Sequence, residues 1–102
     1  MRFGRVEGFV RQQDGLDGPM LWLTVSLETG RSITVVREER LAPLRPITSA
    51  DDLSWHADQW TQETIGVDLA EAGWEVVGAG DVPEPEEGMV ATSAAYAVRN
   101  LS

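Results

Sequence analysis

The stretch MLWLTVSLETGRSITVVR, residues 20–37, decides the fold of this chain. Its first half has an aliphatic residue at every second position: Leu21, Leu23, Val25 and Leu27. A period of two places these side chains on one face of a β-strand. Gly30 then supplies the freedom in φ that a short hairpin loop requires. The following run from Ser32 to Arg37 is rich in Ile, Thr and Val, so we expect it to return as the partner strand.

Residues 49–73 predict a helical segment. Ser49 can cap its start, and Asp51 and Asp52 follow near the positive end of the helix dipole. The apolar residues of this stretch fall on two roughly opposite faces, which is typical of a helix that is sandwiched or broken. We expect two helical pieces, about 50–64 and 67–73, with a break at Gly66 and Gly73 as the left-handed terminator.

The remaining segments predict strands at 3–11, 74–78 and 89–99, with an extended segment at 40–47 and a loop at 79–88. The predicted order is β-β-β-α-β-β. Runs of strands around one helical segment indicate an α+β fold with a mostly antiparallel sheet. At 102 residues the chain is expected to form a single compact domain, 1–102.

Charge divides this domain into two halves. Residues 1–47 carry seven arginines against six acids, whereas residues 48–102 carry Arg99 alone against eleven acids. The first half is therefore near-neutral and rich in predicted strands, and the second half, helix-strand-strand, holds the excess negative charge. A field of one sign bears on partners and solubility rather than on the fold.

Two stretches resemble known families. Gly73-Trp74-Glu75-Val76, within residues 66–99, resembles the helix-to-strand motif of a small bacterial family of unknown function. The resemblance implies that Gly73 permits the tight exit from the helix and that Trp74 covers the junction. Residues 3–45, with the hinge at Thr29-Gly30-Arg31, are similar to SH3-like small barrels, many of which bind nucleic acid or proline-rich peptides.

The residue types argue against an enzyme. The chain has no cysteine and only one histidine, His56, so cysteine-ligated metal centres, thiolate nucleophiles and histidine-pair metal sites are excluded. Ser54, His56 and Asp58 cannot form a triad on a helix, because side chains two residues apart point in different directions. We expect no catalytic residue, no metal and no cofactor. No apolar run reaches the length of a membrane helix and no secretory leader is recognisable, so we expect a cytoplasmic protein.

Our main hypothesis is a non-catalytic protein-interaction module that docks on a basic protein, in one version an inhibitor or immunity-type protein. The acidic candidates are Asp81, Glu84, Glu86, Glu87, Asp58 and Glu63. The 80–88 segment can also be a solvated loop or a cation site, although it lacks the oxygen spacing of an EF-hand. The aromatic candidates are Trp22 and Trp55. Trp22 is an exposed anchor if the sheet stays open and is covered if the sheet curls into a barrel.

The alternative hypothesis is an SH3-like module that binds nucleic acid. Its candidates are arginines of the first half: Arg5, Arg31, Arg37 and Arg40. Phosphate contacts require these arginines to cluster on one face while the acids point elsewhere, and the net charge of −9 opposes approach at long range. A long final strand at a sheet edge would also allow pairing with a second copy of the chain.

Overall fold

The computed structural model describes residues 1–16, 18–40 and 50–101. Three long strands come first: β1 (Arg2–Gly15), β2 (Gly18–Thr29) and β3 (Ser32–Arg40). The helical segment is α1 (Ala50–Thr64), continued by the π-helix η1 (Ile65–Leu69). The chain closes with β4 (Trp74–Ala79), β5 (Met89–Thr92) and β6 (Tyr96–Asn100). The expected extended segment at 40–47, beyond Arg40, and the capping role of Ser49 lie outside the described residues.

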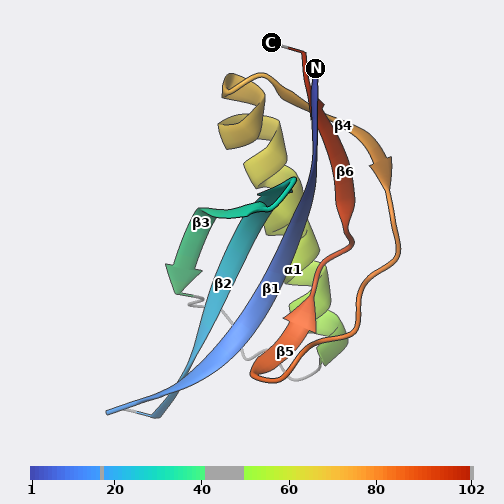
Figure 1. The fold of residues 1–102 in the computed structure, drawn as a ribbon. Coiled ribbons are helices and arrows are strands. Elements are labelled where there is room, and N and C mark those ends of the chain that lie inside the picture. The colour runs from blue at the N-terminus through green and yellow to red at the C-terminus, as the bar shows by residue number, and fades with distance from the viewer. Residues whose placement is uncertain (17, 41–49, 102) are drawn as a thin grey trace.

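All six strands form one antiparallel sheet in the order β3-β2-β1-β6-β4, with β5 also paired to β1. The predicted hairpin is confirmed: Leu27 of β2 pairs with Thr34 of β3, and Gly30 in the turn has a φ of 58°. β1 is the central strand, because one of its edges pairs with β2 while the other pairs with β6 and then β5. Figure 1 shows α1 behind this sheet. The α+β class and the antiparallel sheet are thus confirmed.

The helical segment does not break at Gly66. The chain passes from α1 directly into the π-turn of η1, and the flanking residues Thr64 and Ala70 keep ordinary helical dihedrals. The wider turn rotates the residues that follow it around the helix axis. As a result Ile65 and Leu69 are buried, whereas Val67 between them is 52% exposed.

The helix ends as the sequence predicts. Gly73 adopts a φ of 93°, which is the left-handed conformation, and Trp74 directly after it is buried in the core.

The final strand is interrupted, which corrects the predicted element order. Residues 89–99 were expected to form one strand, but β5 and β6 are separated by residues 93–95. At the interruption the backbone N–H of Gly8 donates to the Ser93 side-chain oxygen at 2.8 Å instead of to a ladder carbonyl. A side chain that competes in this way ends regular strand pairing. In one continuous strand Ala91 and Val98 would face opposite sides of the sheet. With the interruption between them, both lie in the core.

The core lies between the sheet and α1. Val6 and Val10 of β1, Leu23 and Val25 of β2, and Val98 of β6 are fully buried. Between Val6 and Val10, Gly8 lies directly under α1: a Cβ added there would be 2.0 Å from Thr61 Oγ1. This contact requires glycine and sets how closely the helix approaches the sheet. In the part of the chain that the structure describes, no helix is both long and apolar enough to cross a membrane.

Candidate functional site

The helix covers only one face of the sheet, and the other face, which we call the open face, carries a second set of side chains. The register places Arg5 opposite Glu28, Phe9 opposite Thr24 and Arg11 opposite Trp22 on this face. It points toward the viewer in Figure 1. Several large apolar side chains remain exposed there, among them Phe3 at 64%, Ile33 at 71% and Val35 at 56%.

Part of the open face is hollowed into an open groove of about 540 Å³. Its floor is formed by β1 and β2, one wall by β3, and the other wall by β5 and the loop before it. The apolar lining consists of Phe9, Ile33, Val35, Pro83 and Met89. The charged lining consists of Arg5, Glu7, Glu28, Glu84 and Glu86. We refer to this set of residues as the groove.

The charge of the groove is strongly negative. Its lining has one arginine against four glutamates, and Arg5 is already paired with Glu7 at 2.5 Å. The other three glutamates form no ion pair among the described residues: Glu28, Glu84 and Glu86. An apolar surface with unneutralised carboxylates around it favours a ligand that is both apolar and positively charged.

The acidic loop, residues 80–88, is held against this face by backbone contacts. Gly80 N donates to Ala95 O at 2.7 Å, and Thr92 Oγ1 donates to Pro83 O at 2.5 Å. Met89 N donates to Glu86 O at 2.9 Å, which closes the turn into β5. These bonds fix the loop backbone while its carboxylate side chains stay exposed.

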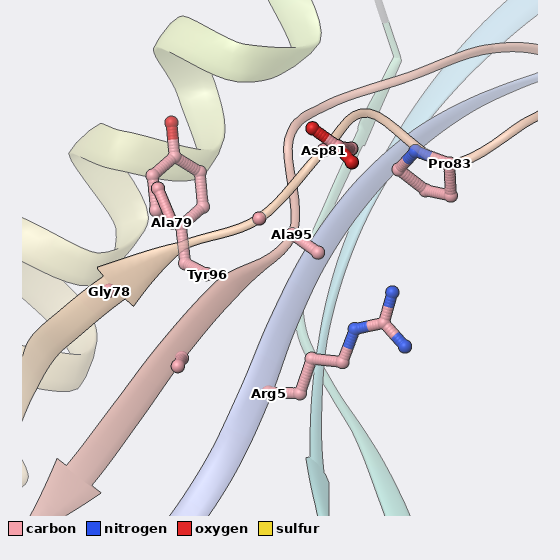
Figure 2. A pocket seen from close by; sticks show the side chains of 9 residues that line it. Arg5, Gly78, Ala79, Asp81, Pro83, Ala95 and Tyr96 are labelled. Carbon is pink, nitrogen blue, oxygen red and sulfur yellow. The ribbon is translucent and has the colours of Figure 1, made fainter.

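A second open pocket of about 560 Å³ lies on the other side of the same loop. Arg5 and Pro83 line both pockets, and Asp81 lines only this one. Figure 2 shows Arg5 reaching away from the helical segment, whereas Tyr96 points toward it. The register agrees, since Arg5 pairs with Ala97 and the neighbouring Val6 pairs with Tyr96. The loop therefore brings Asp81, Glu84 and Glu86 to the open face, and Glu87 is exposed in the turn that follows.

Asp58 lies elsewhere and is occupied by internal hydrogen bonds. Its Oδ1 accepts from Tyr96 OH at 2.8 Å and from Ala94 N at 3.1 Å. Its Oδ2 accepts from Gln62 Nε2 at 2.7 Å, and the same nitrogen donates to Tyr96 OH at 3.1 Å. This network ties α1 to the connection between β5 and β6. Burial, followed by the hydrogen bond to Asp58, raises the pKa of Tyr96 above its ordinary value.

Glu63 and Trp55 lie on the helix, away from the groove. The Glu63 carboxylate is 3.7 Å from Arg37, and Trp55 is 60% exposed with its ring packed edge-on against His56. The structure therefore brings together three of the six acidic candidates, Asp81, Glu84 and Glu86, and separates them from Asp58 and Glu63.

The four arginines of the alternative hypothesis do not form one patch. Arg37 lies on the helix side of β3, where it pairs with Glu39 at 2.8 Å and stacks over Trp60 at 4.3 Å. Arg5 lies on the open face in contact with Glu7. Arg31 is exposed in the β2–β3 turn, and Arg40 is exposed at the end of β3, opposite Trp22.

Trp22 lies on the open face and is half-buried. Its register neighbours are Arg11 on one side and Arg40 on the other. Trp22 Nε1, Arg11 Nε and Thr24 Oγ1 are buried and have no hydrogen-bond partner among the described residues. Trp22 is therefore neither a fully exposed anchor nor fully covered, and it does not line the groove.

Phe9, Ile33, Val35 and Met89 were not among the candidates chosen from the sequence. A signal for two of them was available, because Ile33 and Val35 alternate in a strand whose partner already supplied a full inward face. Phe9 likewise lies an odd number of positions from Val6 and Val10, so its side chain points to the other face of the strand. Strands that are apolar on both faces indicate that the second face is also used.

No protein-family model matches the chain, and no curated protein or solved structure is significantly similar to it. Within the described residues, no three histidine or acidic side chains converge as they would around a metal ion.

Proposed function

We propose that this chain is a non-catalytic protein-interaction module that docks a basic protein partner in the groove on the open face. The observation that supports this most strongly is the combination of apolar and negatively charged side chains in the groove. An apolar surface from β1, β3 and β5 lies beside carboxylates of the acidic loop, and its only arginine is already paired.

The two components have different physical roles in docking. Burial of exposed apolar side chains such as Ile33 and Val35 supplies affinity, because their contact with water is unfavourable. The carboxylates, together with the net charge of −9, attract a cationic partner and raise the rate of encounter. In one version of the proposal the partner is a nuclease-like toxin, and docking masks its cationic site.

The test compares capture of partners from a native lysate by three forms of the protein. The groove variant is Glu84→Gln/Glu86→Gln, and the matched control is Asp68→Asn/Glu71→Gln, which removes the same charge from the exposed end of the helical segment. The wild type and the control should recover a basic protein at low salt, and the groove variant should recover much less. Recovery should also fall at high salt, because added ions screen exposed charges.

Two results would contradict the proposal. One is equal recovery by the groove variant and the control. The other is a partner whose capture is independent of ionic strength.

A further inference from the structure

The edge strand β3 borders the groove and offers an unpaired backbone edge. β3 ends the sheet order, and in the part of the chain that the structure describes no strand pairs with its outer side. Edge strands in soluble proteins are usually protected by charged residues, proline or a bulge. In β3 the charges are confined to residues 37–40, and the register with β2 shifts at Val36, whereas residues 32–35 keep a regular register and carry no charge and no proline. This uncharged half of the strand is open to an additional strand.

The side chains of this half face the groove at alternate positions. Ile33 and Val35 line the groove and are 71% and 56% exposed. Ile33 lies directly opposite Glu28 of β2. A strand added outside β3 would place every second side chain beside Ile33 and Val35, at about 5 Å between Cβ atoms. It would lie about 9–10 Å from β2, within the combined reach of an arginine on the added strand and the Glu28 carboxylate.

Charge decides between the two kinds of strand that fit such an edge. A second copy of this chain would bring another net charge of −9 to an already negative surface, and like charges oppose that association. A basic segment would instead be attracted to the carboxylates of Glu28, Glu84 and Glu86.

We propose that the partner inserts an extended basic segment that pairs with residues 32–35 of β3 as an added strand. Aliphatic side chains at alternate positions of this segment pack on Ile33 and Val35, and a flanking arginine or lysine side chain reaches Glu28. Glu84 and Glu86, on the opposite wall of the groove, attract the segment by their charge. The inference rests on the proposed function, because it specifies how the basic partner enters the groove. Main-chain hydrogen bonds supply affinity in this mode, and the alternate side chains supply specificity.

The probe is a synthetic peptide, Arg-Thr-Val-Thr-Val-Thr-Arg, acetylated and amidated at its ends. As a strand it presents both valines and both arginines on one face. The matched control peptide is N-methylated at its five central residues, which keeps every side chain and charge but removes the N–H donors that strand pairing needs. Binding is measured by calorimetry at low salt, and hydrogen exchange reports which backbone amides of the protein become protected.

The unmodified peptide is expected to bind about tenfold or more tightly than the methylated one, because several hydrogen bonds are lost on methylation. Val35→Lys should weaken binding by a similar factor, while Val76→Lys, a substitution of a comparably exposed valine on the opposite edge strand β4, should leave it unchanged. Amides within residues 32–35 should exchange more slowly in the complex.

Equal binding of the two peptides, or protection outside β3, would overturn strand addition and leave docking of a basic partner standing. Failure of both peptides to bind, alongside groove-dependent capture of a basic protein, would do the same. Conversely, peptide pairing at β3 combined with partner capture that ignores Glu84 and Glu86 would overturn the proposed function alone. A dimer in solution that Val35→Lys dissociates would also overturn the inference, since a second copy would then occupy the edge.

Discussion

Gly8→Ala tests the closest approach between α1 and β1. An alanine Cβ at this position would lie 2.0 Å from Thr61 Oγ1 and 3.3 Å from both Ala57 O and Ser93 Oγ. Contacts of a Cβ below 3.0 Å are essentially never found, so the first of these distances must increase. Thr61 is fully buried and donates to Ala57 O at 2.7 Å, so it has little freedom to move away.

The expected cost follows from these contacts. Inserting one carbon into a well-packed core costs about 1–3 kcal/mol. If Thr61 rotates to make room, the loss of its hydrogen bond adds about 1 kcal/mol. We therefore expect Gly8→Ala to lower the free energy of unfolding by about 2–4 kcal/mol, which for a domain of this size is a drop in Tm on the order of 10–20 °C.

Urea unfolding followed by circular dichroism measures this change, and a double-mutant cycle identifies its cause. In a Thr61→Ala background, where the offending oxygen is gone, Gly8→Ala should cost at least about 1 kcal/mol less than in the wild type. Gly66→Ala is the control, because a Cβ at Gly66 meets no atom within 4 Å. A change below about 0.5 kcal/mol for Gly8→Ala, or full additivity with Thr61→Ala, would refute close packing of Gly8 against Thr61.

Three further predictions concern single side chains. Burial and the hydrogen bond to Asp58 raise the pKa of Tyr96, the only tyrosine, above 10.0. The free energy of unfolding should therefore fall as the pH rises above that value, because the unfolded chain loses the tyrosine proton more readily. Tyr96→Phe should abolish this fall. Absorbance titration of tyrosinate should show the pKa moving down in Asp58→Asn. Thr24→Val should raise the free energy of unfolding by about 1 kcal/mol in urea melts, because it removes a buried hydroxyl without a partner; a loss of stability would indicate that the hydroxyl is bonded. Arg37→Lys should cost about 0.5–1 kcal/mol and change the fluorescence of Trp60, because an ammonium group lacks the planar stack at 4.3 Å; unchanged stability and emission would contradict that contact.

Local patterns in the sequence predicted the parts of the fold that depend on neighbouring residues. The alternation of Leu21, Leu23 and Val25 identified a strand with one buried face, and the structure buries Leu23 and Val25 completely. Gly30 and Gly73 were placed correctly as the turn and the helix terminator, because their positive φ values suit a residue without a Cβ. Such features are determined within a few residues of chain.

The errors arose where distant segments meet. The interruption between β5 and β6 depends on Ser93, whose hydroxyl accepts from Gly8, a residue 85 positions away. The π-turn at Gly66 could not be separated from a break by periodicity, since both shift the apolar face in the same way. The candidate acids were likewise divided by tertiary contacts, because Asp58 bonds to Tyr96 while Glu84 and Glu86 line the groove.

The sequence by itself determined the strand hairpin, the helical segment and its end, and the excess of negative charge in residues 48–102, because each depends on local spacing or on composition. Only the tertiary structure decided that the acidic loop lies beside Ile33 and Val35 of β3, some 50 residues earlier in the chain. Sheet pairing between β1 and β5 brings these segments together, and pairing partners so far apart leave no periodic trace in the sequence.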